Sequence, residues 1–315
     1  MGAALAFTPL TLHSHYWLGI VTTGYLMAGL AGAWNIIGGF GGQFSLGHGI
    51  FFAIGAYLTA ILYTQAGISP WVTILPASLI AALVAVGISW LTFRLRGPFF
   101  VIATMALSQV FLVLVNYLDW PTGGPQGILI PFHPSLKNMI LRERWKWTLM
   151  MFVFLAIVVA ISIVIRRSRF GFYLLASRED DESARAAGVD VVSVRSRGMA
   201  LSAMLTSIGG SLFAMYFRYI DPPSVLGLAE VGVKFALLSL IGGLGTIPGP
   251  VLGAALIVPL ENYLRVKLGG SWPGIHLAIL GAIMLLAALF MKRGIVGVGE
   301  YVLARRRYRN RIPPP

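Results

Sequence analysis

The sequence predicts an all-α fold, a polytopic bundle of transmembrane helices, and three observations carry this prediction. Hydrophobic residues make up 57% of the 315 residues and charged residues only 11%, against about 25% charged residues in an average soluble domain. No Asp, Glu, Lys or Arg occurs before Arg94. Apolar runs recur with lengths near the roughly 20 residues that a helix needs to cross the hydrocarbon core. Lipid is therefore the expected solvent for most of the chain.

The apolar runs give the candidate spans in order. They are 16–37, 44–65, 71–93, 99–118, 147–165, 199–219, 231–241, 251–264 and 274–291. The total is about nine crossings at the usual length of a transmembrane helix. The seventh and eighth pieces are short and are separated by Gly and Pro residues, so Gly/Pro-broken or re-entrant helices are expected there.

Basic residues between the spans set the expected orientation, because Lys and Arg are enriched in cytoplasmic loops. The link with Arg94 and Arg96, the Arg-rich segment 166–198 and the basic tail 304–315 are all expected in the cytoplasm. This places the N-terminus outside and the C-terminus inside. The segment 119–146 then lies outside although it carries basic residues of its own, which is the weakest agreement with the rule.

The net charge of +13 admits two interpretations. Nucleic-acid binding needs basic residues on one folded face, whereas here they lie between apolar runs and in the tail, where contact with anionic membrane lipid is the simpler reading. The chain has no cysteine, no G-x-x-x-x-G-K-[ST] phosphate loop and no H-E-x-x-H pattern. We therefore expect no catalytic residue, no metal, no cofactor, no nucleic-acid partner and no enzymatic activity in this chain.

The polar segment 166–198 contains a short helix with both ends marked. Ser177 is the expected N-cap, with Asp180 three residues later in a capping box, and Glu179 lies in the first turn, where the helix dipole favours negative charge. Gly188 is the expected C′ residue. Such a short helix is unstable alone, so it either docks into a partner or is a solvated connector between two spans.

Small residues recur every fourth position in the segment 41–53. If this stretch is one helix, they form a ladder that lets two helices approach closely; these residues are Gly41, Ser45, Gly49 and Ala53. The alternative is a discontinuous helix whose free backbone groups meet a substrate within the membrane. Gln43, Ser45 and His48 favour that alternative, because polar groups at this depth need partners.

Glycine recurs with the same spacing near the C-terminal end. Gly245, Gly249 and Gly253 are interrupted by Pro248 and Pro250, so a tight interhelical turn is favoured over a continuous helix. Two acid–base pairs spaced i, i+4 could form ion pairs on helices. They are Glu230 with Lys234 and Glu261 with Arg265. Both are open to interpretation as interfacial charges or as residues that receive substrate from an outside binding protein.

Three segments resemble a known family. The run Glu-Ser-Ala-Arg-Ala-Ala-Gly at 182–188 resembles the Glu-Ala-Ala-x-x-x-Gly loop of ABC importer permeases, with Ser183 in place of the second motif residue. Together with 41–57 and 241–254, the longer stretch 167–185 is similar to the branched-chain amino acid ABC transporter permease family of the LivM type. The three segments occur in the order found in that family.

This resemblance implies a single permease domain over 1–315 in the bacterial inner membrane, with a cytoplasmic loop at 166–198 that holds a coupling helix. The implied partners are ABC ATP-binding subunits, a second permease subunit and an extracytoplasmic substrate-binding protein. The implied coupling residues are Ser177, Glu179, Asp180, Glu182, Ala184, Ala187 and Gly188. On the discontinuous-helix interpretation of 41–53, the expected substrate pathway passes Gln43, Ser45, His48 and Gly49.

The expected function is import of branched-chain or related small amino acids by alternating access, driven by a partner ATPase. A self-sufficient secondary carrier or channel for a small polar solute is the alternative. Ion-coupled carriers hold ionisable groups inside the membrane, whereas the acids of this sequence fall near the expected ends of the spans.

Overall fold

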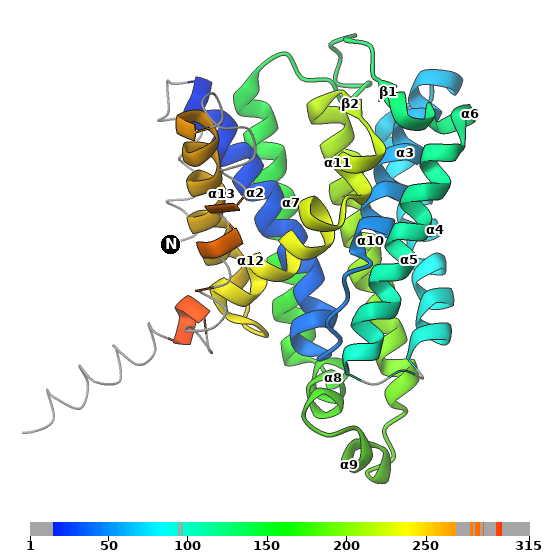
Figure 1. The fold of residues 1–315 in the computed structure, drawn as a ribbon, viewed down its shortest axis with the longest axis vertical. Helices are drawn as coiled ribbons and strands as arrows, with labels where there is room; N and C mark the ends of the chain where they lie inside the picture. Colours follow the sequence, from blue (N-terminus) through cyan, green and yellow to red (C-terminus); the bar gives the residue numbers. More distant parts are fainter. Residues whose placement is uncertain are drawn as a thin grey trace, which may run out of the picture.

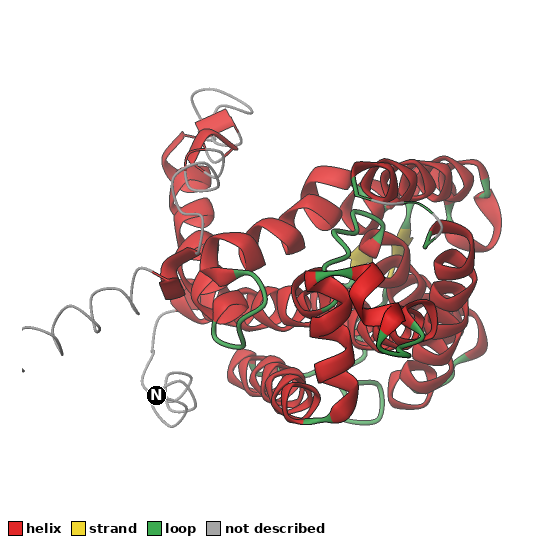
Figure 2. Cartoon of the chain, turned by 90° about the horizontal axis from the view of Figure 1, so that it is seen from below, coloured by secondary structure: helices red, strands yellow, loops and turns green. Residues whose placement is uncertain are grey.

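The computed structural model describes residues 15–93, 95, 97–268 and short pieces between 278 and 297. In this part of the chain the protein is a helical bundle, which confirms the predicted fold class (Figures 1 and 2). Among the described residues, seven helical stretches are long and apolar enough to cross a membrane. The expected count of nine is not confirmed. The helix over the expected span 251–264 is not among the seven, and the span 274–291 lies largely outside the described residues and the tail 304–315 entirely so.

The spanning stretches follow the predicted order with small shifts at their ends. The first six are α2 (His15–Asn35), α3 (His48–Ala66), α4 (Pro70–Thr92), α5 (Pro98–Tyr117), α7 (Arg144–Arg167) and α10 (Val191–Phe217). The seventh, Pro222–Gly243, is assembled from three pieces. They are α11 (Pro222–Leu226), the π-helix η3 (Leu228–Val233) and α12 (Lys234–Gly243). A further helix, α13 (Gly249–Leu268), packs against α2 and α12.

The two ends of the bundle differ (Figure 1). At the lower end in that view, α8 (Arg169–Glu179) and α9 (Asp181–Ala186) project beyond the spans. At the opposite end lie α6 (Asp119–Thr122), the 3-10 helix η2 (Gly124–Gln126) and two short antiparallel strands, β1 (Ile128–Leu129) and β2 (Tyr219–Ile220). The strands pair Ile128 with Ile220 and so join the 119–143 segment to the end of α10.

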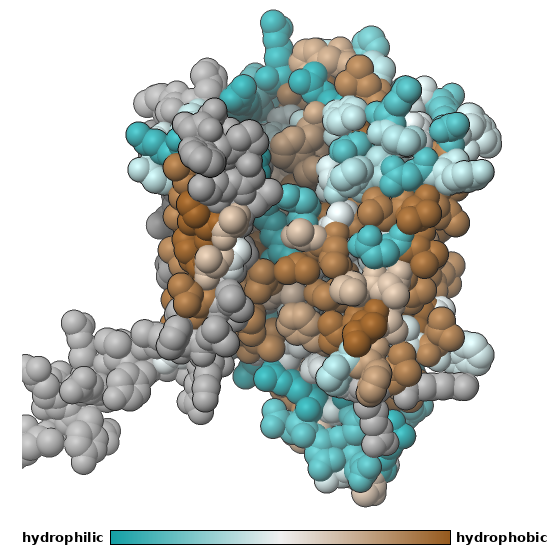
Figure 3. All heavy atoms as spheres, in the orientation of Figure 1, coloured by the Kyte–Doolittle hydropathy of each residue, from teal (hydrophilic) through white to brown (hydrophobic). Residues whose placement is uncertain are grey.

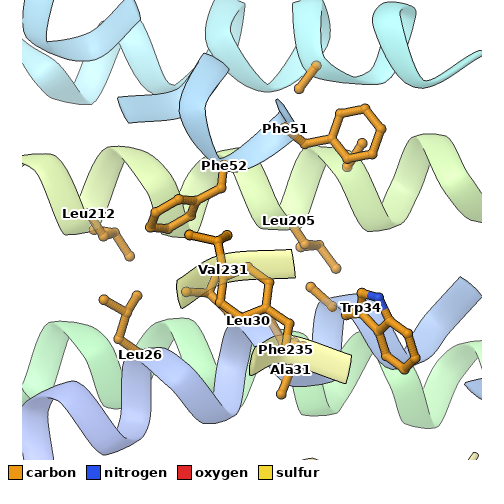
Figure 4. Packing of buried hydrophobic residues seen from close by; sticks show 14 of the residues in the cluster. Leu26, Leu30, Ala31, Trp34, Phe51, Phe52, Leu205, Leu212, Val231 and Phe235 are labelled. Carbon is orange, nitrogen blue, oxygen red and sulfur yellow. The ribbon is translucent and has the colours of Figure 1, made fainter. Parts of the chain in front are cut away.

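Burial separates the inner helices from the outer ones. In the most apolar window of each, α10 and the α2–η1 stretch are 72% buried, whereas α5 is only 22% buried. The inner contacts join α2, α3, α10 and the η3–α12 piece through large apolar side chains (Figure 4). Exposed apolar side chains such as Leu83 and Phe99 lie on α4 and α5. Figure 3 shows a hydrophobic belt around the middle of the bundle. A belt of this kind suits contact with lipid.

The segment 41–53 is not one helix, so the expected small-residue ladder is not formed. The π-helix η1 (Ile36–Phe40) continues α2, the backbone then leaves helical geometry, and α3 begins only at His48 rather than at residue 44. Close helix approach occurs further along α3. A Cβ added at Gly55 would lie 1.9 Å from the Ser207 carbonyl oxygen, and one at Gly210 would lie 2.1 Å from that of Phe52.

Candidate functional site

The helix at the projecting end starts at a different cap from the one expected. Ser177 is buried inside α8, and its hydroxyl donates to the Leu174 carbonyl (2.8 Å). The N-cap of α9 is Asp180, whose carboxylate accepts from the backbone N–H groups of Glu182 (2.8 Å) and Ser183 (3.1 Å). These hydrogen bonds hold the pKa of Asp180 below its usual value. The helix ends here because the backbone of Asp180 is extended (φ −155°, ψ 115°). The expected helix is therefore divided between the last residues of α8 and the whole of α9.

The C-terminal end of α9 has the geometry of a Schellman motif. Gly188 has φ +84°, a conformation in which a Cβ is unfavourable. The Val189 N–H donates to the Ala184 carbonyl (3.0 Å) and the Gly188 N–H donates to that of Arg185 (2.9 Å). Both bonds satisfy carbonyls that a helix end leaves unpaired. The six residues of α9 are therefore closed at both ends.

The implied coupling residues divide into an outer and an inner set. The outer set is exposed: Glu179, Asp180, Glu182, Ala187 and Gly188. The inner set, Ser177 and Ala184, is buried within this chain at 1% and 5% exposure. Only the outer set presents its side chains on the surface, so Ala184 supports α9 from within instead of lining its outer face.

Arg195 of α10 holds the junction between α8 and α9 in place. Its guanidinium donates to the Asp181 carboxylate (Nη1 to Oδ2, 3.0 Å) and to the Ser177 carbonyl. In the orientation that presents its oxygen, the Gln43 amide also accepts from Arg195 (3.1 Å from Nη1). Gln43 thus lines a small cavity beside the α8–α9 junction together with Asp181 and Arg195. The sequence had indicated a place for Gln43 on a substrate pathway.

Two further arginines near the projecting end donate hydrogen bonds to backbone carbonyls at the ends of other helices. Arg178 of α8 donates to the Gly39 carbonyl in η1 (2.6 Å), and Arg166 of α7 donates to the Gly245 carbonyl (2.8 Å). Asn35, at the end of α2, is also hydrogen-bonded to the α12–α13 turn. Its Nδ2 donates to the Thr246 carbonyl and its Oδ1 accepts from the Gly245 N–H, both at 2.9 Å. Arg178 therefore bonds α8 to η1, whereas the α12–α13 turn is bonded by Arg166 of α7 and by Asn35 of α2.

The polar groups of the α2–α3 break are satisfied within the chain. The Ser202 hydroxyl donates to the Ala33 carbonyl (2.7 Å), so His48 Nε2 donates to Ser202 (2.9 Å) and His48 Nδ1 accepts from the Ser45 hydroxyl (3.2 Å). The Trp34 indole donates to the Ser45 carbonyl (2.7 Å). Ser45, His48 and Gly49 are buried. The side chains of Ser45 and His48 bond other protein groups, so in this conformation the α2–α3 break does not expose them to a solute.

The three glycines near the C-terminal end divide between a turn and a helix contact. Gly245 has φ +75° in the turn between α12 and α13. Gly249 and Gly253 lie on α13, where an added Cβ would come within 2.2 Å of the Gly243 carbonyl oxygen and 1.9 Å of the Leu238 carbonyl oxygen. The structure thus has the tight interhelical turn, and α13 continues through Pro250 as its second residue.

The ion pairs inside the bundle are partly those expected. Glu261 of α13 is 4% exposed and accepts from Lys234 of α12 (2.7 Å) and from Arg265 one turn later (3.1 Å). The expected Glu261–Arg265 pair is confirmed, but Lys234 pairs with Glu261 instead of Glu230. The partner of Lys234 comes instead from the neighbouring helix α13, which packs against α12.

In the part of the chain that the structure describes, the fold is that of a polytopic helical membrane protein. A profile of the family described as "Branched-chain amino acid transport system / permease component" matches residues 16–288. The protein belongs to this family, and the family resemblance found in the sequence is confirmed.

Several curated relatives are similar over most of this chain. The high-affinity branched-chain amino acid transport system permease protein LivM of Escherichia coli (strain K12) is 26% identical over 295 residues, which cover 86% of this chain and 67% of the relative. LivH of Salmonella typhimurium is 23% identical over 296 residues, covering 89% and 94%. The autoinducer 2 import system permease protein LsrC of Yersinia enterocolitica is 24% identical over 188 residues, covering 59% and 49%. No solved structure matches the chain significantly.

Sequence reasoning missed Asn35 and the role of Arg195. A signal for Asn35 was available, because an amide inside an apolar run must find partners at membrane depth. Arg195 was counted only among the basic residues of its segment. Nothing in its spacing identifies Asp181, 14 residues away and on another helix, as its partner.

Proposed function

We propose that this chain is the transmembrane subunit of an ABC importer that moves branched-chain or related small amino acids across the bacterial inner membrane. One observation carries the proposal. A short helix, capped at both ends, projects from the bundle and is tied by Arg195 to α10. Its exposed outer residues form the face that would seat in an ATP-binding subunit.

The proposed sidedness follows from charge. The projecting end carries the arginines of 166–198, and basic segments of this kind stay in the cytoplasm. ATP-binding subunits would dock there, and an extracytoplasmic binding protein would deliver substrate to the opposite end. A second permease subunit would complete the pathway, and the two would alternate between inward- and outward-facing states.

The amino-acid substrate is proposed from the relatives, whose names refer to branched-chain amino acids.

Coupling would pass from α9 through Arg195 to Gln43 in the α2–α3 break, and from α8 through Arg178 to Gly39 in η1. These contacts are direct hydrogen bonds. A movement imposed on α8 and α9 would therefore reach the end of the α2–η1 stretch and the break that follows it.

The test is co-purification followed by a matched substitution. Wild-type protein should co-purify with an ABC ATP-binding protein from its own organism. Ala187→Trp, on the exposed face of α9, should lower that recovery and the substrate-stimulated ATPase rate by about tenfold, a typical effect of disturbing one central contact of an interface. Leu136→Trp, which adds similar bulk at the opposite end where Leu136 is 73% exposed, should leave the recovery of the ATP-binding protein unchanged. Equal recovery of Ala187→Trp and wild type would contradict the proposal.

A secondary carrier is the second candidate, and a specific observation favours it. Lys234 and Glu261 form an ion pair within the bundle, contrary to the expectation that acids lie near the span ends, and such groups mark coupling sites in ion-driven carriers. The two candidates differ in energy source. Uptake that persists without the ATPase but stops when the proton and sodium gradients are collapsed would establish the carrier.

A further inference from the structure

A cavity of about 480 Å³ lies beside the Lys234–Glu261 pair. Its walls come from α2, α3, α10, α11, η3, α12 and α13. Its size lies within the usual range of small-molecule pockets, roughly 300–1,000 Å³. In Figure 3, hydrophilic surface lies in a hollow within the hydrophobic belt, between the α13 side and the α11 side.

The cavity lies at membrane depth. Gly249 begins α13 next to the turn at the α8 end of the bundle, and Glu261 lies 12 residues further along the helix. At a rise of 1.5 Å per residue, Glu261 is about 18 Å from that end. The hydrocarbon core is about 30 Å thick, so this charged group is inside it. Charges at such a depth are costly and are retained where they have a role.

Two side chains of opposite charge, Glu230 and Lys234, line this cavity and can each bind a ligand group. Glu230 is exposed to the cavity and has no ion-pair or hydrogen-bond partner among the described residues. Lys234 is held by Glu261 at 2.7 Å, but an ammonium group has three N–H donors, so it can still donate to a ligand. Glu230 lies in the π-helix η3 and Lys234 begins α12, and π-helical turns recur at functional sites.

Aromatic and apolar side chains form much of the remaining wall, together with the polar Thr23, Ser224 and Asn262. Phe52 stacks against Phe213 and Phe235, with ring centroids 5.1 and 5.7 Å apart, and all three rings line the cavity. Figure 4 shows Phe52, Val231 and Phe235 pointing toward one another from α3, η3 and α12. The site thus combines an anion, a cation and an aromatic surface. The charges of Glu230, Lys234, Glu261 and Arg265 sum to zero (−1 +1 −1 +1).

The geometry points to this cavity as a binding site for a zwitterionic amino acid with an apolar side chain. Glu230 accepts from the ligand ammonium, Lys234 donates to the ligand carboxylate, and Phe52 and Phe235 contact the side chain. Glu261 and Arg265 keep Lys234 in position. This assignment rests on the proposed function and makes it more specific, because a net-neutral site with both charges selects a zwitterion over an amide, a sugar or a singly charged analogue.

The test measures uptake of radiolabelled L-leucine by cells that express the complete transporter. Unlabelled L-leucine should compete in the wild type, whereas 4-methylpentanoate, which lacks the ammonium, and 3-methylbutylamine, which lacks the carboxylate, should compete at least about tenfold less well. Glu230→Gln should raise the half-saturating leucine concentration by about tenfold or more and weaken the discrimination against 4-methylpentanoate. Glu143→Gln, an exposed acid paired with Lys146 at 3.2 Å, is the matched control and should leave uptake unchanged.

A second variant guards against a simple folding defect. Exchanging the pair, Lys234→Glu with Glu261→Lys, retains an internal ion pair but places a second anion beside Glu230, so leucine uptake should fall at least tenfold while the complex still assembles. Normal leucine uptake by Glu230→Gln or by the exchanged pair overturns the assignment and leaves the importer proposal intact. Equal competition by all three compounds in the wild type also overturns it. A wild-type complex that couples to its ATPase but takes up no zwitterion refutes both this site and the proposed substrate, while the importer itself stands.

Discussion

Arg195 of α10 donates to both carboxylate oxygens of Asp181 at the start of α9, with Nη1 3.0 Å from Oδ2. The pair is mostly shielded from solvent, since the side chains are 10% and 25% exposed. Bidentate arginine–carboxylate pairs fix orientation as well as distance. The direction in which α9 projects is therefore set by a residue on a membrane-spanning helix.

Removing this guanidinium should loosen α9. In Arg195→Met, the loss of hydrogen bonds to a charged group should lower the free energy of local opening by about 1.5–3 kcal/mol. Hydrogen–deuterium exchange of the amides of 181–189 should accelerate by roughly tenfold or more. Arg197→Met, two residues away and exposed, is the control. Equal protection in both variants would show that Arg195 does not hold α9.

The Asp180 cap should be replaceable by another capping side chain. Asn accepts the same two backbone hydrogen bonds, whereas Ala cannot, so Asp180→Ala should reduce protection of α9 amides and Asp180→Asn should retain most of it. The pH dependence has a defined sign. Because the pKa of Asp180 is lowered in the folded state, its stabilisation is present above the ordinary carboxylate value and is lost as pH falls through the lowered one. Asp180→Asn should lose this acid sensitivity, as measured by exchange at a series of pH values.

Asn35 should stabilise the fold, because it joins the end of α2 to the turn between α12 and α13. Asn35→Leu conserves side-chain size but leaves the Gly245 N–H and the Thr246 carbonyl unpaired, at a cost of about 1–3 kcal/mol for each unsatisfied group. The melting temperature in detergent should fall. Asn116→Leu is the control, because the Asn116 amide bonds only the Leu112 carbonyl one turn earlier. A melting temperature equal to that of wild type would exclude a structural role for the Asn35 bridge.

The contact between α3 and α10 should not accept even one methyl group. Gly55→Ala places a Cβ 1.9 Å from a backbone oxygen, so the helices must separate, at a typical overpacking cost of about 1–3 kcal/mol. Gly87→Ala on α4 meets no atom within 4 Å, and should be neutral or stabilising by up to about 1 kcal/mol because Ala is the better helix former. Thermal unfolding of the two variants compares them directly, and a Gly55→Ala protein as stable as Gly87→Ala would refute the close approach.

Local patterns predicted more of the candidate site than long-range ones did. Gly188 was placed correctly at the end of α9, because a C′ glycine is dictated by the chain next to it. Ser177 is not the N-cap, since α8 continues through it and Asp180 accepts the capping hydrogen bonds. The Glu230–Lys234 pair is not formed, because Lys234 meets Glu261 of α13, a partner that spacing along one helix does not identify.

From the amino-acid sequence alone we could predict the lipid environment of the spans, the all-α fold class and the permease family. Long uncharged runs can bury their backbone in lipid only as helices, and the three matching segments lie along a single chain. Tertiary structure decided which polar groups meet. Asn35 reaches Gly245 across 210 positions and Lys234 reaches Glu261 across 27. Such partners depend on how helices pack against one another, and the hydrophobic pattern that drives each helix into the membrane does not specify that packing.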